Sequence, residues 1–180
     1  MAAPHNTKRY GETWDANEIT VLAGEIDALK DLVVVSGGWA WHFMSPPHKE
    51  LKHAHDHKDV DLFVAPGQMW ELMACLAERS YEKTWTRFDG VSDDFHRYTK
   101  TVDGVKPVKV ILDVFTGDLP AVDTPSGIRV VQPAALLPLY GVKHSSVQCF
   151  SVQIARKLMA RGIDPNGRPE MADFTEFLKG

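Results

Sequence analysis

The sequence predicts an α+β fold, a mixed β-sheet with flanking helices and a short C-terminal helical segment. Three stretches predict this class. Residues 32–35 are apolar without interruption and run into a glycine turn, and residues 108–115 have the pattern of a strong buried strand. After Pro133 the apolar spacing is helical. The 180 residues suffice for a single domain with a hydrophobic core.

The composition indicates a folded protein and excludes several classes. Hydrophobic residues make up 44% and charged residues 24%, which excludes disorder as the main state. A formal net charge of −4 excludes an overall basic surface of the kind that attracts nucleic acids. Two cysteines are too few for a disulfide framework. No apolar run approaches the about 20 residues that span a bilayer, so we expect a cytoplasmic protein without membrane contact.

The first predicted helix and strand lead into the glycine turn. Apolar residues recur at helical spacing from Ile19 to Leu29, and Thr13 or Asp15 can cap the start of this helix. The helix is expected to end at Asp31. The strand at residues 32–35 follows, and its unbroken apolarity predicts burial on both faces.

The remaining elements follow from apolar periodicity and from the turn residues between them. In chain order we expect a short helix at 39–44, a polar loop at 45–56, a strand at 58–64, a helix at 66–79, strands at 81–88, 95–102, 108–115 and 128–131, and helices at 134–140, 146–160 and 169–178. As domains, we expect a flexible arm at 1–12, a core at 13–132, and a helical segment at 133–180 that packs on the core.

Three aspartates carry the strongest chemical signal. Asp59 and Asp61 are two positions apart in a predicted strand, so both carboxylates should point to one face of it. Asp113 interrupts an otherwise apolar strand, where a charge is costly unless it is paired or bound to a metal. If the two strands are neighbours, three carboxylates converge, and Mg²⁺ is the ion that such oxygen ligands suit. A solvated strand edge is the ordinary alternative for an Asp-x-Asp pair.

The turn formed by Ser36, Gly37 and Gly38 is a candidate phosphate site. It lies between a strand and the expected start of a helix, where backbone N–H groups favour an anion. Neither the Walker pattern nor G-x-G-x-x-G is present. A plain tight turn would explain the same residues.

Taken in order, three motifs resemble the nucleotidyltransferase superfamily with the polymerase-β-like palm. They are Gly37-Gly38-Trp39-Ala40, then His57-x-Asp59-Val60-Asp61-Leu62, then Asp113 in its apolar strand. The pattern is most similar to the small lincosamide and aminoglycoside nucleotidyltransferases, and the likeness covers residues 32–115. The resemblance implies a nucleotidyltransferase fold. It also implies Mg²⁺-dependent (or Mn²⁺-dependent) transfer of NMP from an NTP, ATP or GTP, to a hydroxyl of an acceptor, which could be a small molecule, an RNA or a protein.

The resemblance also implies roles for individual residues. Asp59, Asp61 and Asp113 would be the catalytic metal ligands, with Asp113 as the general base. Ser36, Gly37 and Gly38 would hold the phosphates.

Three further residues have weaker roles under the same resemblance. Lys143 follows the sheet, where superfamily members often carry a lysine that meets the triphosphate; a solvated helix end is the alternative. His57 could orient Asp59 or a phosphate. Trp39 is either a core aromatic or part of the nucleotide pocket.

Other interpretations stay open at this level. The chain could be a non-catalytic nucleotide-binding or antitoxin-type partner protein on the same fold, and a homodimer is compatible with either function. A zinc-dependent hydrolase is a third option, because four histidines lie close together in sequence: His48, His53, His55 and His57. His96 and Arg97, in the predicted hairpin of the strands at 81–88 and 95–102, could reach a ligand, although nothing in the sequence demands it.

Overall fold

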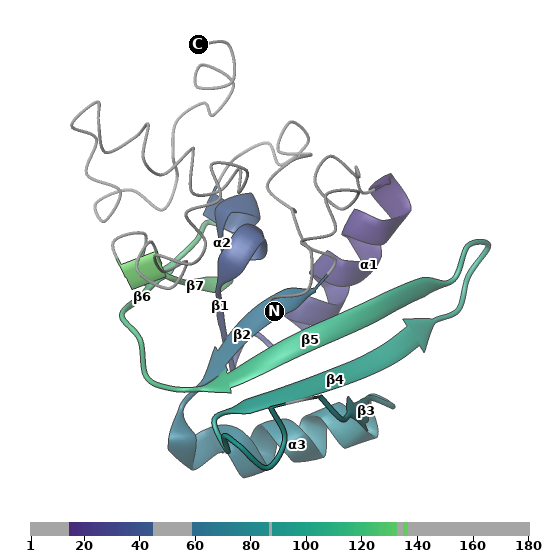
Figure 1. The fold of residues 1–180 in the computed structure, drawn as a ribbon. Helices are drawn as coiled ribbons and strands as arrows, with labels where there is room; N and C mark the ends of the chain where they lie inside the picture. The colour runs from purple at the N-terminus through teal and green to yellow at the C-terminus, as the bar shows by residue number, and fades with distance from the viewer. Residues whose placement is uncertain (1–14, 45–58, 87, 133–134, 137–180) are drawn as a thin grey trace, which may run out of the picture.

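Seven strands form one mixed sheet in the part of the chain that the structure, a computed structural model, describes (Figure 1). That part comprises residues 15–44, 59–86, 88–132 and 135–136. The strand order is β3-β4-β5-β2-β1-β7-β6. The bounds are α1 Ala16–Asp27, β1 Val34–Val35, α2 Gly37–Met44, β2 Val60–Val64, the 3₁₀ helix η3 Pro66–Gln68, α3 Met69–Glu78, β3 Glu82–Thr84, β4 Phe95–Val102, β5 Val108–Thr116, β6 Ala121–Asp123 and β7 Arg129–Val131.

The predicted α+β class with a mixed sheet is confirmed. The predicted arm at 1–12, the loop at 45–56 and the helices at 146–160 and 169–178 lie outside the described residues. So does nearly all of the helix expected at 134–140, of which only residues 135–136 are described, as helical. None of the described helices is long and apolar enough to cross a membrane.

Helix α1 begins as the sequence predicts and ends earlier. Asp15 accepts a hydrogen bond from the Glu18 backbone at 2.8 Å, and the Glu18 side chain accepts one from the Asp15 backbone at 2.9 Å. The helix stops at Asp27 instead of Asp31. Two hydrogen-bonded turns follow it, and they keep Leu29 in the core at 1% exposed.

Strand β3 is the element that differs most from its prediction. It was expected over residues 81–88 and covers Glu82–Thr84. The Asp89 carboxylate accepts a hydrogen bond from the Thr86 backbone N–H at 2.6 Å and pairs with Lys83 at 2.8 Å. This side-chain turn ends the strand, because it satisfies backbone groups that a longer ladder would use. Strand β6 was not predicted.

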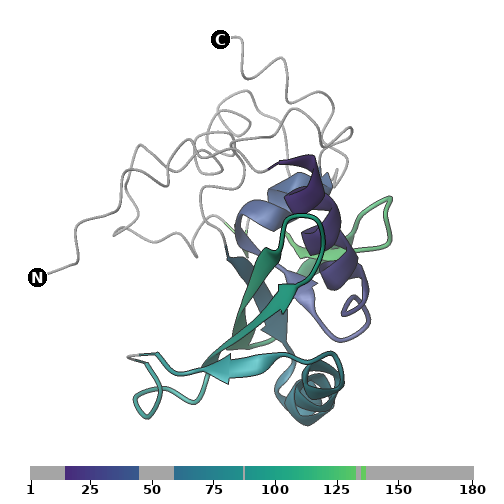
Figure 2. The same cartoon turned by 90° about the vertical axis from the view of Figure 1, so that its right-hand side faces the viewer.

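The core lies against one face of the central strands. In β2 the burial alternates, with Val60, Leu62 and Val64 at most 1% exposed and the residues between them half-buried. The buried side chains join Leu22 of α1 and Leu72 of α3 in one apolar cluster. Helices α1 and α3 both lie on the right of the strands in Figure 2. The two residues between the buried positions of β2 therefore face away from this helical layer.

A polar network ties α1 to α3 and β4. The Glu25 carboxylate accepts hydrogen bonds from Tyr81 at 2.9 Å and Arg79 at 3.1 Å, and Lys100 lies 2.7 Å from it. Burial alone would raise the pKa of Glu25. The hydrogen bonds from Lys100, Tyr81 and Arg79 outweigh it and hold that pKa below the ordinary value of 4.5.

We expect Glu25→Ala to lower the free energy of unfolding by about 2 kcal/mol at pH 7, because it leaves two cations and a hydroxyl without their acceptor. A folded-state pKa below the unfolded value means that this stability is present above pH 4.5 and is lost as the pH falls through the folded pKa. Urea unfolding of both proteins should therefore show a difference that shrinks below pH 4.5. The exposed Glu78→Ala is the control, and a loss of the same size there would contradict this role for Glu25.

Candidate active site

Three charged side chains form a row across the middle of the sheet. Strands β2 and β5 are parallel and pair Asp61 with Asp113, and strands β5 and β4 are antiparallel and pair Asp113 with Arg97. Directly paired residues point to the same face of a sheet. The row therefore lies on the face opposite the buried side chains of β2. The sequence predicts that Asp61 and Asp113 meet if their strands are neighbours. Strands β2 and β5 are neighbours, and their register pairs the two residues.

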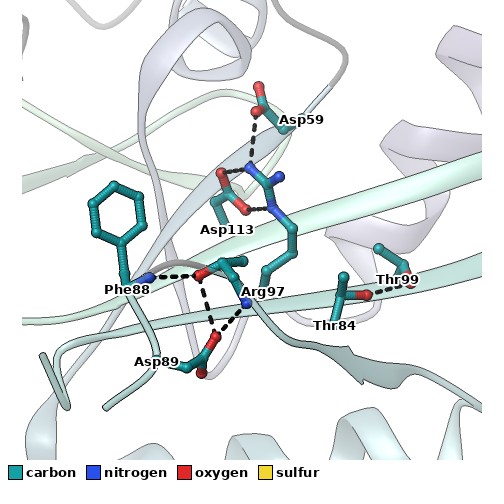
Figure 3. Close-up of polar contacts among 8 residues, drawn as sticks. Asp59, Thr84, Phe88, Asp89, Arg97, Thr99 and Asp113 are labelled. Carbon is teal, nitrogen blue, oxygen red and sulfur yellow. Dashed lines mark hydrogen bonds and ion pairs between the residues drawn. The ribbon is translucent and has the colours of Figure 1, made fainter. Parts of the chain in front are cut away.

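Arg97 contacts two carboxylates, those of Asp113 and Asp59 (Figure 3). Its Nε lies 2.6 Å from Oδ1 of Asp113, and one terminal nitrogen lies 2.6 Å from Oδ2 of the same carboxylate. Another contact, 3.5 Å long, joins Arg97 to Asp59, which directly precedes β2. A planar guanidinium thus grips one carboxylate with two bonds and also touches a second.

The acids carry more charge than one guanidinium can balance. Burial, together with the charges of Asp59 and Asp113, raises the pKa of Asp61 to about 8, against the opposing effect of Arg97. Burial also raises the pKa of Asp113, which is 6% exposed, against the opposing effect of its bond to Arg97. Carboxylates crowded in this way stay ionised only when more positive charge is supplied.

The glycine turn lies directly against Asp61. Gly37 has φ +61°, and a Cβ placed there would collide with Oδ2 of Asp61. The Ser36 backbone N–H donates to the Asp61 carbonyl at 2.8 Å, which fixes the turn to β2. Helix α2 begins at Gly37, so the residues predicted as a separate turn include the start of the helix, which was expected at Trp39.

This use of Ser36 changes what the turn can offer to a phosphate. Its backbone N–H is already bonded to the Asp61 carbonyl, so Ser36 has its hydroxyl to offer and not its amide. Backbone N–H groups in the first turn of a helix have no acceptor within that helix. Gly37 and Gly38 are the first two residues of α2, so their backbone N–H groups are the ones that this turn can offer to a phosphate.

Aromatic side chains lie both in the core and on the charged face of the sheet. Trp39 is 1% exposed and belongs to the core cluster, with its ring 4.8 Å from that of His42. On the charged face, two residues along each strand from the charged side chains, three half-buried phenylalanines are paired across the strands. The ring of Phe115 lies 5.3 Å from that of Phe63 and 5.1 Å from that of Phe95. An apolar floor thus continues from the acids along the sheet.

The chemistry of the donors fits a divalent cation. Three carboxylates supply the oxygen ligands that Mg²⁺ prefers, and the crowding that raises the pKa of Asp61 is relieved by a positive charge. Within the described residues, no three His, Cys, Asp or Glu side chains already surround one point. Both oxygens of Asp113 are bonded to Arg97. By the chemistry of their oxygen donors, Asp59, Asp61 and Asp113 fit Mg²⁺.

Not every predicted site residue can be placed. His57 and Lys143 lie outside the described residues, as do the other histidines of the proposed zinc cluster. Their roles stay predictions. Arg97 is the site residue that sequence reasoning left without a role, although it makes the shortest contacts to Asp113.

Comparison with known proteins gives the fold a name. No protein-family model and no curated protein matches the chain. A solved structure, ANT(2″)-Ia in complex with adenylyl-2″-tobramycin, matches with a TM-score of 0.55 at 14% identity, over 82% of this chain and 93% of that one. The Megavirus polyadenylate synthase matches with a TM-score of 0.42 at 14% identity, over 88% of this chain and 33% of that one. The chain therefore has the nucleotidyltransferase fold.

Proposed function

We propose that this protein is a Mg²⁺-dependent nucleotidyltransferase that moves NMP from ATP or GTP to a hydroxyl of an acceptor and releases pyrophosphate. The observation that carries the proposal is the pairing of Asp61 with Asp113 beside Gly37 at the start of α2. It brings two carboxylates next to the start of a helix, on a fold shared with a nucleotidyltransferase. Carboxylates suit Mg²⁺ and a helix N-terminus suits a phosphate, and this supports the proposal.

Under this proposal, Asp59, Asp61 and Asp113 hold the metal. Mg²⁺, or Mn²⁺ in its place, would neutralise charge on the phosphates and on the leaving pyrophosphate. The amides of Gly37 and Gly38 and the Ser36 hydroxyl bind the phosphates, with Lys143 as a further candidate.

Asp113 is the candidate general base. One of its carboxylate oxygens would accept the proton of the acceptor hydroxyl. The hydroxyl oxygen then bonds to the α-phosphorus, and the bond to the bridging oxygen of the pyrophosphate breaks. The raised pKa of Asp113 suits this role, because a base with a higher pKa takes a proton more readily.

The transfer itself tests the proposal. The full chain is incubated with α-labelled ATP or GTP and Mg²⁺, first with an aminoglycoside such as tobramycin and then with fractionated cell extract. We choose tobramycin first because the similar ANT(2″)-Ia structure contains its adenylylated form. We expect label on one acceptor together with released pyrophosphate, and we expect both to disappear with EDTA.

A matched pair of variants makes this test specific. Asp59→Asn should lose label transfer by roughly a thousandfold, because it removes a metal ligand. Asp123→Asn makes the same change at an exposed position of β6 and should keep it. Equal transfer by the two variants would contradict the assignment of Asp59.

One observation favours a second candidate function. Arg97 occupies both oxygens of Asp113 and touches Asp59, so the chain itself supplies a cation to the acids. A protein that binds nucleotide without turnover, or an antitoxin-type partner, could use this arrangement as it stands. Such a protein would bind ATP or GTP equally well with Mg²⁺ and with EDTA, and would transfer no label to any acceptor.

A further inference from the structure

We propose that Arg97 is a displaceable counter-cation of the acidic row, by which we mean Asp59, Asp61 and Asp113. Arg97 must leave Asp113 when a divalent ion binds, and its bond to Asp113 thereby weakens metal binding. In this role Arg97 is a positioning residue and not a ligand or a catalytic residue. The inference rests on the proposed function, because it concerns the metal that this function requires.

The hydrogen bonds of Arg97 place it in direct competition with a metal. Its two bonds of 2.6 Å engage both oxygens of Asp113, so an ion bound at either oxygen would share that oxygen with the guanidinium. Its third contact, 3.5 Å long, goes to Asp59. One guanidinium therefore bridges two of the three carboxylates.

Electrostatic repulsion means that Arg97 and a divalent ion replace each other at the Asp113 carboxylate. A guanidinium and a divalent cation repel each other at the distances at which both could contact one carboxylate. Without metal, Arg97 lowers the cost of crowding the acids. Once a divalent ion supplies that charge, the guanidinium is redundant and is repelled.

Arg97 also has a route out. Its side chain is 32% exposed, whereas the Asp113 side chain is 8% exposed. The guanidinium can rotate toward solvent and regain hydration there, since a long side chain carries its charge on a flexible stem. Asp113 lies inside the apolar strand β5 and stays in place. The mobile partner of the pair is thus the cation.

Binding of Mn²⁺ to the full-length protein, followed by the electron spin resonance signal of the free ion, tests the inference without any turnover. We expect Arg97→Gln to bind Mn²⁺ about tenfold more tightly than wild type, because the ion no longer has to break a bidentate charged pair. The Mn²⁺ affinity of Arg97→Lys should lie between those of the two proteins, since lysine keeps the positive charge and cannot form two parallel hydrogen bonds to Asp113. The control is Arg79→Gln, which breaks an arginine–carboxylate pair with Glu25 and should leave Mn²⁺ affinity unchanged.

The outcomes separate this inference from the proposed function. Equal or weaker Mn²⁺ binding by Arg97→Gln, with measurable wild-type binding, would overturn the inference and leave the function standing. Binding by Arg97→Gln alone would support the inference and contradict metal-dependent transfer by the wild type. No binding by either protein would overturn both. Asp61→Asn should lower Mn²⁺ affinity in each background, which assigns the ion to the acidic row.

A measurement on the wild type covers the case in which Arg97→Gln does not fold. In a ¹⁵N NMR spectrum the Nε–H signal of Arg97 can be assigned by its disappearance in Arg97→Lys. We expect this signal to shift or broaden on titration with Mg²⁺, because its hydrogen bond to Asp113 breaks. An unchanged signal at Mg²⁺ saturation would show that Arg97 stays on Asp113 and would overturn the inference.

Discussion

Replacing Asp61 by asparagine is expected to make the metal-free protein more stable and to abolish Mg²⁺-dependent nucleotidyl transfer. Asp61 is crowded by burial and by the charges of Asp59 and Asp113, and these effects raise its pKa to about 8. Asparagine has nearly the same shape and no charge, so it removes the repulsion without opening a cavity. Under the proposed function, transfer should fall by roughly a thousandfold, since Asp61 is one of the proposed metal ligands.

The stability gain has a definite pH dependence. The ordinary pKa of an aspartate is 3.8, and the folded protein raises that of Asp61 to about 8. Between these values the folded state holds a proton that the unfolded state has lost, so the unfolding free energy falls as the pH rises. Asp61 therefore costs nothing below pH 3.8, and its cost is complete above pH 8. The advantage of Asp61→Asn should be absent near pH 4 and largest above pH 8.

Urea unfolding in EDTA at pH 4.5 and at pH 8.5 measures this difference. We expect Asp61→Asn to be more stable than wild type by roughly 2 kcal/mol at the higher pH and by much less at the lower. Asp123→Asn, at an exposed position of β6, should change stability by about 0.5 kcal/mol or less at both. A variant that is less stable than wild type at pH 8.5 would show that Asp61 is not under like-charge strain. Saturating Mg²⁺ should reverse the order of the two proteins.

The local sequence pattern was enough to single out the three aspartates as candidate site residues. It was not enough to predict that Asp61 and Asp113 lie side by side. Alternation along β2 predicts that Asp59 and Asp61 share a face, and the buried positions on either side of Asp61 agree with it. The pairing of Asp61 with Asp113 depends on which strands are neighbours. Strands β3 and β4 lie between β2 and β5 in the chain, yet β2 and β5 are adjacent in the sheet. That order is set by tertiary packing, on which apolar periodicity carries no information.

Arg97 is different, because the sequence held a signal for it. The Asp103-Gly104 pair marks a turn between the strands expected at 95–102 and 108–115, and two strands joined by such a turn are typical of a hairpin. In the structure Val102 pairs with Val108, and the antiparallel register then brings Arg97 opposite Asp113. A single register assumption at the turn would have predicted this ion pair. The position of the turn alone does not fix the register, because the loop length also has to be known.

Both the fold and the candidate site require that residue 37 has no Cβ. Gly37 was predicted for its amide, as part of a phosphate-binding turn. The structure adds two constraints on the side chain, a φ of +61° and the Asp61 carboxylate at the place of a Cβ. Neither can be read from a Gly-Gly pair, since both follow from how α2 meets β2.

We therefore expect Gly37→Ala to lower the free energy of unfolding by about 3 kcal/mol and to abolish transfer. The positive φ alone costs about 1–2 kcal/mol with a Cβ present. The collision with Asp61 Oδ2 adds to this, and turning the carboxylate does not relieve it fully. The Asp61 Cγ would itself lie 3.2 Å from the new Cβ, which is too close, whereas the Asp61 Cβ at 3.4 Å would be in ordinary contact. To clear the carboxyl group, Asp61 has to move away from its partner Asp113 or α2 has to shift.

A double-mutant cycle separates the two causes. In Asp61→Ala the colliding carboxylate is gone, so Gly37→Ala in that background should cost only the part due to φ. The two changes together should thus destabilise the protein by less than the sum of the single changes. Gly24→Ala is the control, because Gly24 lies in α1 with open space around it, and alanine there should stabilise the helix by up to about 1 kcal/mol. Strict additivity of Gly37→Ala and Asp61→Ala would mean that Asp61 does not lie against the turn. The acidic row and the proposed phosphate-binding helix start would then be separate features, and the proposed site would lose the contact that joins them.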